Sequence, residues 1–394
     1  MTFYKNIYRF IAFAILFFAG CSTQKDAMIN RWYHKINTKY NGLFYAKEHL
    51  KEGIKKIHNS HEDNYQNIIS INTYSNLKSA TIAQSSLDQA IEKSTAAIKQ
   101  HSMDIDGEEK NRLIPEAYMV IGKAQFYKQD YTQAINTFNY VSRKSPEPNQ
   151  QTEALLWVAR SQQQLNNHQA LQKTLNNLEE EHYLSTQQEG DFFQIQAELE
   201  IAKQDLTKAK GLLTKAIKKT KSKKLKTRMY YILGQISIIL GDNSEATQNF
   251  TEVIKKNPKY ELIFNAKLNK IKSHNPIDDN IEKIKQDLYK MIKDKKNLEY
   301  KDQLYFSLGL IELKNLDTTS AITSIGLSAV NSTNNINQKI ESHYLLANIF
   351  WNQKAYIKSY NHCDSAYRMT ESTHPDYQKI KTMLRSSKKI AQLY

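Results

Sequence analysis

The chain has 394 residues, enough for two or three domains or for one long array of repeats. It contains only 11 glycines and 6 prolines, which disfavours a sheet-rich fold with many tight turns. Two cysteines, Cys21 and Cys363, exclude a disulfide framework if the first is modified. The net charge of +15 favours an anionic partner. In a cytoplasmic protein this would suggest nucleic acid, and in an exported protein it would suggest an acidic protein or lipid headgroups.

Residues 1–20 have the pattern of an export signal. Two basic residues precede an uncharged run from Phe10 to Ala19, and small residues lead directly into Cys21. This order is typical of a bacterial lipoprotein signal. We expect cleavage before Cys21, acylation of that cysteine, and a tether over residues 21–30. An uncleaved transmembrane anchor is the alternative, although the run is shorter than the roughly 20 apolar residues that a span needs.

Residues 31–112 are predicted to form an N-terminal helical region. A Ser-x-x-Gln sequence at residues 86–89 predicts a capping box that opens a helix over residues 87–100. We expect this helix to pair with an earlier one around residues 65–77, which makes an eighth, irregular helix pair. The dipeptide Asp106-Gly107 predicts a loop after it.

A repeat dominates residues 113–370. One packing position recurs at alternating steps of 37 and 38 residues, at Ala134, Leu171, Ala209, Ala246, Ile284, Ala321 and Ser359. Mostly apolar residues follow four and seven positions later, which places all three on one helix face. Glycine or alanine precedes the position by twelve residues, except at Lys272, so the fifth repeat is predicted to be degenerate.

These spacings predict an all-α fold, a tetratricopeptide-like helical-repeat solenoid of about seven to eight helix pairs. The first unit, with Tyr118, Ile121 and Gly122 on its first helix, resembles one tetratricopeptide repeat. Seven pairs are assigned to residues 113–370. Residues 371–394 are predicted to hold a C-terminal capping helix, from Tyr377 to Leu393.

Motifs for catalysis or metal binding are missing from the sequence. It contains no Gly-rich phosphate loop, zinc knuckle or nucleophile elbow, so we expect no enzyme activity, no cofactor and no metal. The stretch from His58 to Asp63 has metal-ligand residue types, but a turn explains it as well. Glu179 to His182 is expected to be a solvated helix face. Cys363 shares the register of Phe138 and is expected to be buried.

The predicted concave surface supplies one set of partner-binding candidates. In such solenoids the first helices line this surface, and extended ligands bind there. The residues predicted to point outward from it are Glu116, Met119, Lys123 and Phe126 in the first pair, and Tyr231 and Gln235 in the fourth. The alternative is that these side chains contact the neighbouring helix pair.

A basic segment supplies a second set of candidates. From Lys203 to Arg228 the chain has eleven basic residues and one acidic residue. We expect the residues from Lys221 to Arg228 to fill the loop between the third and fourth pairs. The candidates are Lys219, Lys221, Lys223 and Lys224, as a docking patch for an acidic partner or phosphate-bearing lipid. The alternative is a solvated surface.

The N-terminal part also resembles a known family. Residues 30–45 read NRWYHKINTKYNGLFY, and Gly53, Asp63-Asn64-Tyr65, residues 87–93, residues 101–107, Lys110-Asn111 and residues 116–124 follow in order. From Cys21 to about Val141 this resembles the tetratricopeptide lipoproteins of Bacteroidetes that serve type IX secretion and gliding motility, the PorW/SprE family. Two departures are that family members are usually much longer, and that residues 69–72 read ISIN where a Leu-Pro-Val-Glu-like stretch is expected.

The resemblance implies an outer-membrane lipoprotein on the periplasmic face. It implies a scaffold that links periplasmic ring and motor parts of the secretion machine to the outer-membrane translocon, with protein partners and without nucleic acid or small-molecule substrate. Only Cys21 carries over with a role. The alternatives are an assembly factor for outer-membrane proteins and a glycan- or nutrient-binding lipoprotein of a transporter, for which Trp32, Trp157 and Trp351 are few and widely spread.

Overall fold

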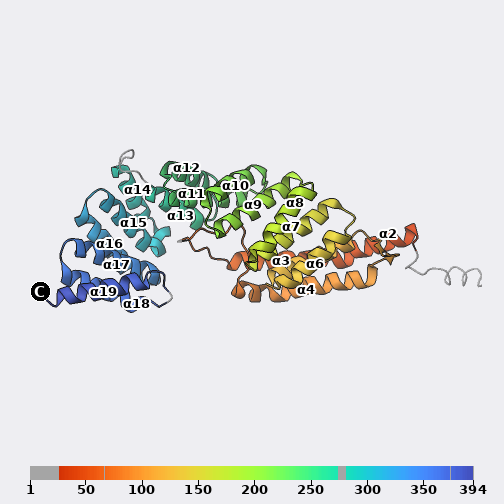
Figure 1. Ribbon diagram of the computed structural model, residues 1–394, viewed down its shortest axis with the longest axis horizontal. Helices are drawn as coiled ribbons and strands as arrows, with labels where there is room; N and C mark the ends of the chain where they lie inside the picture. The colour runs from red at the N-terminus through yellow and green to blue at the C-terminus, as the bar shows by residue number, and fades with distance from the viewer. Residues whose placement is uncertain (1–25, 66, 274–280, 373, 394) are drawn as a thin grey trace, which may run out of the picture. The chain divides into compact units, whose positions relative to one another are not determined.

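The computed structural model describes residues 26–65, 67–273, 281–372 and 374–393 (Figure 1). The chain divides into two compact units, Met1–Ile232 and Leu233–Tyr394. Helices make up nearly all of the regular structure, so the predicted all-α class is confirmed. In the described ranges, no helix is both long and apolar enough to cross a membrane.

The first unit begins with helices that lead into the repeats. Its elements are α2 (Met28–Asn37), the π-helix η1 (Thr38–Leu43), α3 (Phe44–Ser60), α4 (Leu77–His101), β1 (Asp104–Ile105), β2 (Glu108–Glu109), α5 (Ile114–Tyr127), α6 (Tyr131–Lys144), α7 (Pro148–Gln164), α8 (His168–Glu181), α9 (Thr186–Ala202) and α10 (Leu206–Lys219). Helix α11 (Lys223–Ile239) contains the division between the units.

The second unit continues the pattern of paired helices. Its elements are α12 (Asn243–Lys255), α13 (Tyr260–Lys272), α14 (Ile281–Lys293), the 3₁₀ helix η2 (Lys295–Tyr300), α15 (Lys301–Lys314), α16 (Thr318–Asn331), α17 (Ile336–Asn352), α18 (Tyr356–Met369) and α19 (Tyr377–Ala391). Helix α19 packs against α18 and coincides with the predicted C-terminal helix. The predicted domain boundaries themselves stay predictions.

The repeat spacing corresponds to seven helix pairs, from α5/α6 to α17/α18. The packing position is fully buried in six of the seven pairs, and the position four residues later is fully buried in all seven. The fifth pair is the exception, because Ile284 is only partly buried there. The period in the sequence therefore reports which face of each second helix is packed.

Short connections reverse the chain within each pair. Six of the seven pairs, all except the fifth, have a connection of three residues whose middle residue has a positive φ, at Gln129, Asn166, Gln204, Gly241, Leu316 and Lys354. The third residue is the N-cap of the second helix, and its Asp or Asn side chain accepts a backbone N–H in four pairs, at Asn167, Asp205, Asp242 and Asp317. Such caps satisfy donors that the helix itself leaves open.

Glycines allow the two helices of a pair to approach closely. A Cβ atom placed on Gly122 would lie 2.6 Å from the ring of Phe138, and one on Gly234 would lie 2.6 Å from Phe250. Carbon atoms in ordinary contact are about 3.5–4.0 Å apart. The glycine twelve residues before the packing position thus lies against the large side chain four residues after it, on the other helix of the pair.

The fifth pair is irregular, as the degenerate spacing predicts. Lys272 is the last residue of α13. The connection to α14 covers residues 273–280, whereas the other pairs use three residues. Counting twelve residues back from Ile284 therefore reaches the helix end, because the extra residues of this connection lie in between.

The N-terminal region also differs from the prediction. Helix α4 begins at Leu77, where Asn76 and Ser79 form the capping box. Ser86 lies inside this helix and accepts a hydrogen bond from Lys56 (2.8 Å). The partner of α4 is α3, against which it packs side by side (Figure 1). The predicted helix at residues 65–77 is wrong, because that segment is not helical before Leu77.

The predicted loop at Asp106-Gly107 is the turn of a small hairpin. Asp106 (φ +55°) and Gly107 (φ +79°) join β1 to β2, which pair in antiparallel register. Two successive positive φ values are what a two-residue hairpin requires, and Asp-Gly supplies them at low cost. The sequence thus predicts the position of the turn but not the two short paired strands on either side of it.

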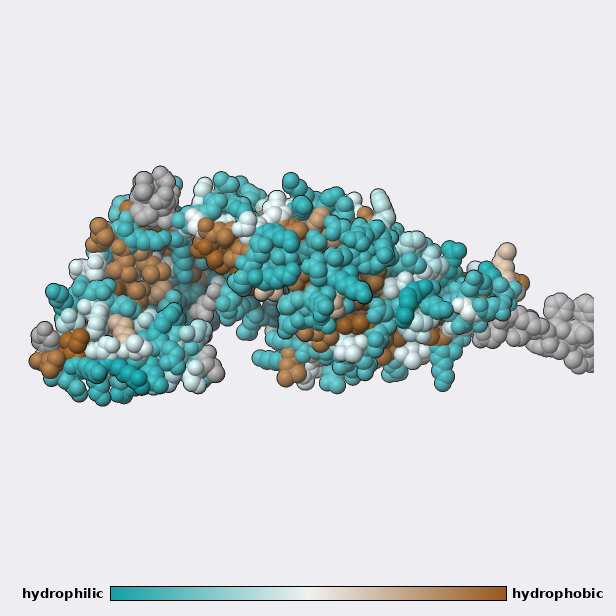
Figure 2. Space-filling model, in the orientation of Figure 1, coloured by the Kyte–Doolittle hydropathy of each residue, from teal (hydrophilic) through white to brown (hydrophobic). Residues whose placement is uncertain are grey.

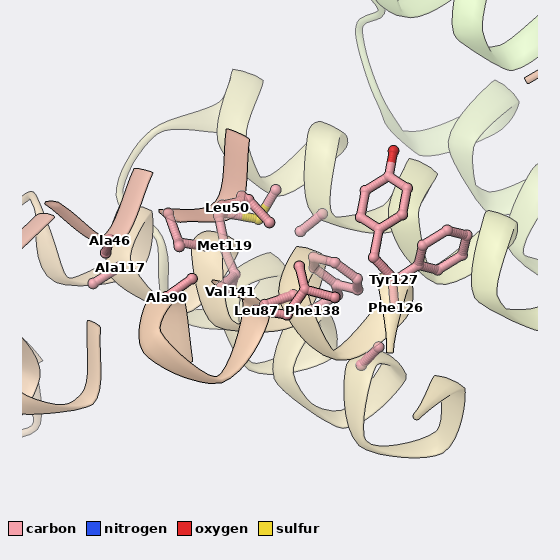
Figure 3. Packing of buried hydrophobic residues seen from close by; sticks show 14 of the residues in the cluster. Ala46, Leu50, Leu87, Ala90, Ala117, Met119, Phe126, Tyr127, Phe138 and Val141 are labelled. Atoms are coloured by element: carbon pink, nitrogen blue, oxygen red, sulfur yellow. The ribbon is translucent and has the colours of Figure 1, made fainter. Parts of the chain in front are cut away.

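Helices α3 to α7 share one hydrophobic core, and Figure 3 shows part of it. Leu50 of α3, Leu87 of α4, Met119 of α5 and Phe138 of α6 are all buried in this cluster. On the face drawn in Figure 2, hydrophilic residues predominate and hydrophobic ones form separate patches. The N-terminal helices are therefore packed into the same core as the first two repeats.

Substitution of glycine by alanine tests the close approach of paired helices. Gly122→Ala should lower the free energy of unfolding by about 1–2 kcal/mol, because overpacking costs about 1–3 kcal/mol or more and the helix gains about 1 kcal/mol. Gly211, inside α10, has no atom within 4 Å of an added Cβ. Gly211→Ala is the matched control and should be stabilising in thermal or urea denaturation. Equal effects of the two changes would contradict the packing described.

Candidate functional site

An extended stretch of the chain lies against the inner helices of the first unit. We call residues 61–76 the inner segment; it joins α3 to α4, and Gln66 within it is not described. Its Tyr74 ring contacts Phe126 of α5, and its Tyr65 ring contacts Tyr231 of α11. Ile71 is fully buried. The segment therefore passes along first helices of several repeats, from α11 back to α5.

The helices contact the backbone of the inner segment as well as its side chains. Arg228 Nε donates to the carbonyl oxygen of Ser70 at 2.6 Å, and Gln129 Nε2 donates to that of Ser75 at 2.8 Å. The backbone N–H of Asn72 donates to Glu198 Oε1 at 3.4 Å. Hydrogen bonds to the backbone depend on the path of the chain more than on which side chains it carries.

A buried ion pair fixes one end of the inner segment. The Arg228 guanidinium donates to both oxygens of Asp63, at 2.6 Å for Nη1 to Oδ2, and the two side chains are only 10% and 12% exposed. His61 contacts the same carboxylate at 2.9 Å. Burial raises the pKa of Asp63, but hydrogen bonds from Arg228 and His61 outweigh this and hold it well below its ordinary value.

A second polar cluster lies under the middle of the inner segment. Arg160 of α7 is buried, stacks over Trp157 at 5.0 Å and pairs with Asp191 of α9 at 3.1 Å. Burial raises the pKa of Glu198 to about 7, against the opposing effects of Arg160 and of hydrogen bonds from Asn72. Glu198 therefore binds a proton more readily than an exposed glutamate does.

An open cavity of about 970 Å³ adjoins these groups. First helices α5, α7, α9 and α11 and the inner segment line it, and second helices α6, α8 and α10 contribute no residue. Its walls carry both signs of charge, with Arg112, Lys123, Arg160, Lys224 and Arg228 beside Glu116, Glu147, Glu153 and Asp191. Trp157 lies among them, with Lys123 Nζ 5.5 Å from its ring centre. This mixture suits a polar, extended ligand better than an apolar small molecule.

Three of the predicted candidates line this cavity. They are Glu116, Lys123 and Lys224. Glu116 pairs with Lys47 of α3, and Lys123 pairs with Glu153 of α7 at 2.7 Å. The structure thus brings together residues from both predicted sets, which no pattern in the sequence connects.

The exposure predicted for four other candidates is wrong. Met119, Phe126, Tyr231 and Gln235 are all buried. Met119 packs into the core shared with α3 and α4, Phe126 lies against Tyr74, and Tyr231 lies against Tyr65. For Met119, Phe126 and Tyr231 the cause is the inner segment and the N-terminal helices, which cover parts of first helices that a bare repeat array would expose.

The basic segment is only partly a loop. Residues 220–222 connect α10 to α11, so Lys223 and Lys224 begin a helix and Arg228 lies within it. The expectation that residues from Lys221 to Arg228 fill the loop is therefore wrong. Lys219 pairs with Glu189 at 2.5 Å, while Lys221 and Lys223 are exposed. A docking role for these lysines stays a prediction.

The remaining candidates have ordinary environments. Asp63 is engaged by Arg228, and the described ranges contain no group of three or more His, Cys, Asp or Glu residues arranged to hold a metal ion. Cys363 is fully buried, as predicted, and burial raises the pKa of its thiol to about 12. A thiol with so high a pKa is a poor nucleophile. Cys21 lies outside the described residues.

Several residues of the site escaped sequence reasoning. Asp63 and Arg228 are 165 positions apart, and Asn72 and Glu198 are 126 apart. Trp157 and Arg160 stand three residues apart on one helix, which is a usable signal for a stacked pair. The long-range partners left no such signal in a single sequence.

Loss of the buried ion pair should loosen the inner segment. Removing one partner of such a pair costs on the order of 3 kcal/mol, so Arg228→Gln should speed local amide hydrogen exchange in residues 67–75 by roughly 100-fold. Lys223→Gln on the same helix is the matched control and should leave exchange unchanged. Unaltered protection in the Arg228 variant would contradict the role assigned to the pair.

The raised pKa of Glu198 predicts a dependence of stability on pH. Burial raises the pKa of Glu198 from its ordinary value of 4.5 to about 7, so the stability that its protonated form contributes is lost as pH rises from about 4.5 through about 7. Glu198→Gln should therefore stabilise the protein at about pH 8.5, by on the order of 1–2 kcal/mol, and have little effect at about pH 4.5. Urea denaturation at both pH values measures this, and a gain only at the lower pH would refute it.

Comparison with known proteins supports the repeat assignment. Residues 227–260 match the model of the tetratricopeptide repeat. No curated protein sequence matches the chain. Among solved structures, it is similar to a tetratricopeptide repeat protein from Parabacteroides merdae, with 15% identity, coverage of 69% of this chain and 98% of that one, and a TM-score of 0.47.

Two further structures are similar at lower scores. PilF of Pseudomonas aeruginosa has 12% identity over 68% of this chain and 96% of that one, with a TM-score of 0.38. A Rap protein complexed with competence and sporulation factor has 12% identity over 71% and 89%, with a TM-score of 0.43. The repeat match at residues 227–260 and the helix pairs together show a tetratricopeptide-like helical-repeat fold.

Proposed function

We propose that the chain is a non-enzymatic, lipid-anchored scaffold whose first unit binds an extended segment of a partner protein in the cavity beside the inner segment. One observation carries the proposal: the inner helices already hold an extended polypeptide, residues 70–75, through its backbone. The cavity of about 970 Å³ continues along the same first helices. A second extended chain would find the same kinds of donor and acceptor there.

The polar groups of the cavity are suited to binding. Arg160 pairs with Asp191, and Lys123 pairs with Glu153, so each charge is held in place before a ligand arrives. Side chains that are already positioned lose less conformational freedom on binding. Tetratricopeptide scaffolds are typically non-catalytic protein-binding modules, and the proposed role follows that pattern.

Attachment to a membrane is proposed from the sequence. The motif Phe18-Ala19-Gly20-Cys21 follows a basic and then apolar stretch, which supports acylation of Cys21. We place the mature protein on the periplasmic face of the outer membrane. There residues 21–27, which precede α2, would hold the helical units close to the membrane and to envelope proteins.

The proposed system is type IX secretion and gliding motility, on the resemblance to the PorW/SprE family. Residues that carry this resemblance have specific positions in the first unit. An added Cβ on Gly42 would lie 2.4 Å from Ala97, one on Gly53 would lie 2.7 Å from Leu87, and Asn111 donates to Thr38 Oγ1 at 2.8 Å. Asp63, also among them, holds Arg228. The resemblance therefore covers residues that build the α2–α4 region and place the inner segment.

Deletion of the gene, followed by complementation, tests the proposal. We expect the deletion to abolish gliding and the secretion of proteins with type IX C-terminal signals, with outer-membrane proteins at normal levels. Depleted outer-membrane barrels would indicate an assembly factor instead, and a growth defect on one nutrient would indicate a binding lipoprotein. Normal secretion would refute the proposed system.

Complementing variants separate the cavity from the rest of the surface. Asn149→Arg with Gln187→Arg adds two bulky charges to exposed positions that line the cavity. Asn176→Arg with Thr214→Arg adds the same charge to exposed positions on second helices α8 and α10. We expect only the second variant to restore secretion, at equal protein levels. Full restoration by the first would contradict a role for the cavity.

A further inference from the structure

The first helical segment of the protein has an exposed apolar stripe. Helices α2, η1 and α3 follow one another without a break, from Met28 to Ser60. Every fourth residue over the first part is apolar or aromatic, at Met28, Trp32, Ile36, Tyr40 and Phe44. Residues four apart lie on one helix face. One turn of an α-helix has fewer than four residues, so side chains spaced by four shift gradually around the helix. The π-helix η1 has more residues per turn and reduces this shift.

The stripe is open to solvent. Met28 is 86% exposed, Trp32 65%, Tyr40 58% and Phe44 53%, whereas Ile36 in the middle of the stripe is only partly exposed. Ile29 and Tyr45 beside it are also more than half exposed. Single exposed apolar residues are common on proteins, but a contiguous row of large ones marks a surface that contacts something else.

The opposite face of the same helices is already packed. His34 and Thr38 are buried, and Thr38 Oγ1 accepts a hydrogen bond from Asn111. His34 Nδ1 lies 3.1 Å from that of His101 at the end of α4. Gly42 lies so close to α4 that a Cβ would be 2.4 Å from Ala97. The helix therefore cannot turn its stripe inward without breaking these contacts.

Basic side chains accompany the stripe. Arg31, Lys35 and Lys39 are exposed, and Lys39 Nζ lies 4.9 Å from the ring centre of Tyr40. Asp26, which pairs with Arg31, is the one acidic residue in residues 26–47. An amphipathic helix with Trp and other apolar residues on one side and basic residues beside them is the pattern of a helix that lies in a membrane interface.

The length of the tether limits how far this helix can be from the membrane. Six residues, 22–27, separate Cys21 from α2. Fully extended, they span at most about 20 Å. If Cys21 is acylated, as the proposed function assumes, α2 is therefore held within reach of the lipid headgroups. Helix α2 also lies at one end of the first unit (Figure 1).

We propose that α2 and η1 lie on the bilayer surface, with the stripe of Met28, Trp32, Ile36, Tyr40 and Phe44 inserted among the headgroups. The basic residues contact anionic lipid, which adds about 1 kcal/mol for each Lys or Arg near the surface. The acylated cysteine and the exposed face of α2 and η1 then both hold the protein at the membrane. The first unit is thereby oriented on the membrane by its own fold and not only tethered to it.

Fluorescence quenching tests this with the full mature protein. The acylated protein is reconstituted into vesicles of phosphatidylcholine and phosphatidylglycerol in which the phosphatidylcholine is brominated near the headgroup end of its acyl chains. Flotation reports whether the protein is attached, and quenching of tryptophan emission reports whether Trp32 reaches the bromines. We expect quenching in the native protein and its loss in Trp32→Phe. Trp351→Phe, in the other unit, is the matched control and should retain it.

The outcomes distinguish the anchor from the helix. Flotation with quenching that depends on Trp32 supports the proposal. Flotation without such quenching overturns it and leaves the lipid anchor standing. Failure to float overturns both. A blue shift of Trp32 emission that rises with protein concentration in the absence of lipid would mean that a second copy covers the stripe, and would also overturn the proposal.

Discussion

The ion pair between Arg228 and Asp63 is the interaction on which the first unit depends. It joins α11 to the start of the inner segment, across 165 positions of sequence, and both side chains are nearly buried. A buried pair of this kind is costly to break from one side, because the remaining charge is left without compensation. With this end fixed, the inner segment follows the first helices to Tyr74, which packs against Phe126. The course of the segment in turn defines one wall of the cavity.

The repeats provide the frame for this arrangement by simple means. Small residues such as Gly122 let paired helices approach, and large ones such as Phe138 fill the space on the partner helix. Connections of three residues with one left-handed residue recur in both units, and the following Asp or Asn caps the next helix. Within the first unit, side chains of the first helices α5, α7, α9 and α11 line one cavity.

Much of the fold could be predicted from the sequence, and the reason is its periodicity. Ala134, Phe138 and Val141 recur in register through seven pairs, so helix faces and partners follow from counting. The spacing also marks the fifth pair as degenerate at Lys272, where the connection before α14 is longer than the others. Prediction failed where a long-range contact intervened. Phe126 and Tyr231 were assigned to the surface because no pattern in one sequence shows that residues 61–76 cover them. Of the site, Glu116, Lys123 and Lys224 could be named in advance, whereas the Asp63–Arg228 pair could not.

The central claim is that the cavity of the first unit holds an extended segment of another protein. The most direct measurement is site-specific photo-crosslinking in intact cells, with a photoreactive residue at Gln187 on the cavity wall or at Asn176 on a second helix. The account predicts that Gln187 crosslinks to one short stretch of an envelope protein of the secretion machine, which mass spectrometry would locate, and that Asn176 does not. Crosslinks from Asn176 alone, with none from Gln187, would contradict it.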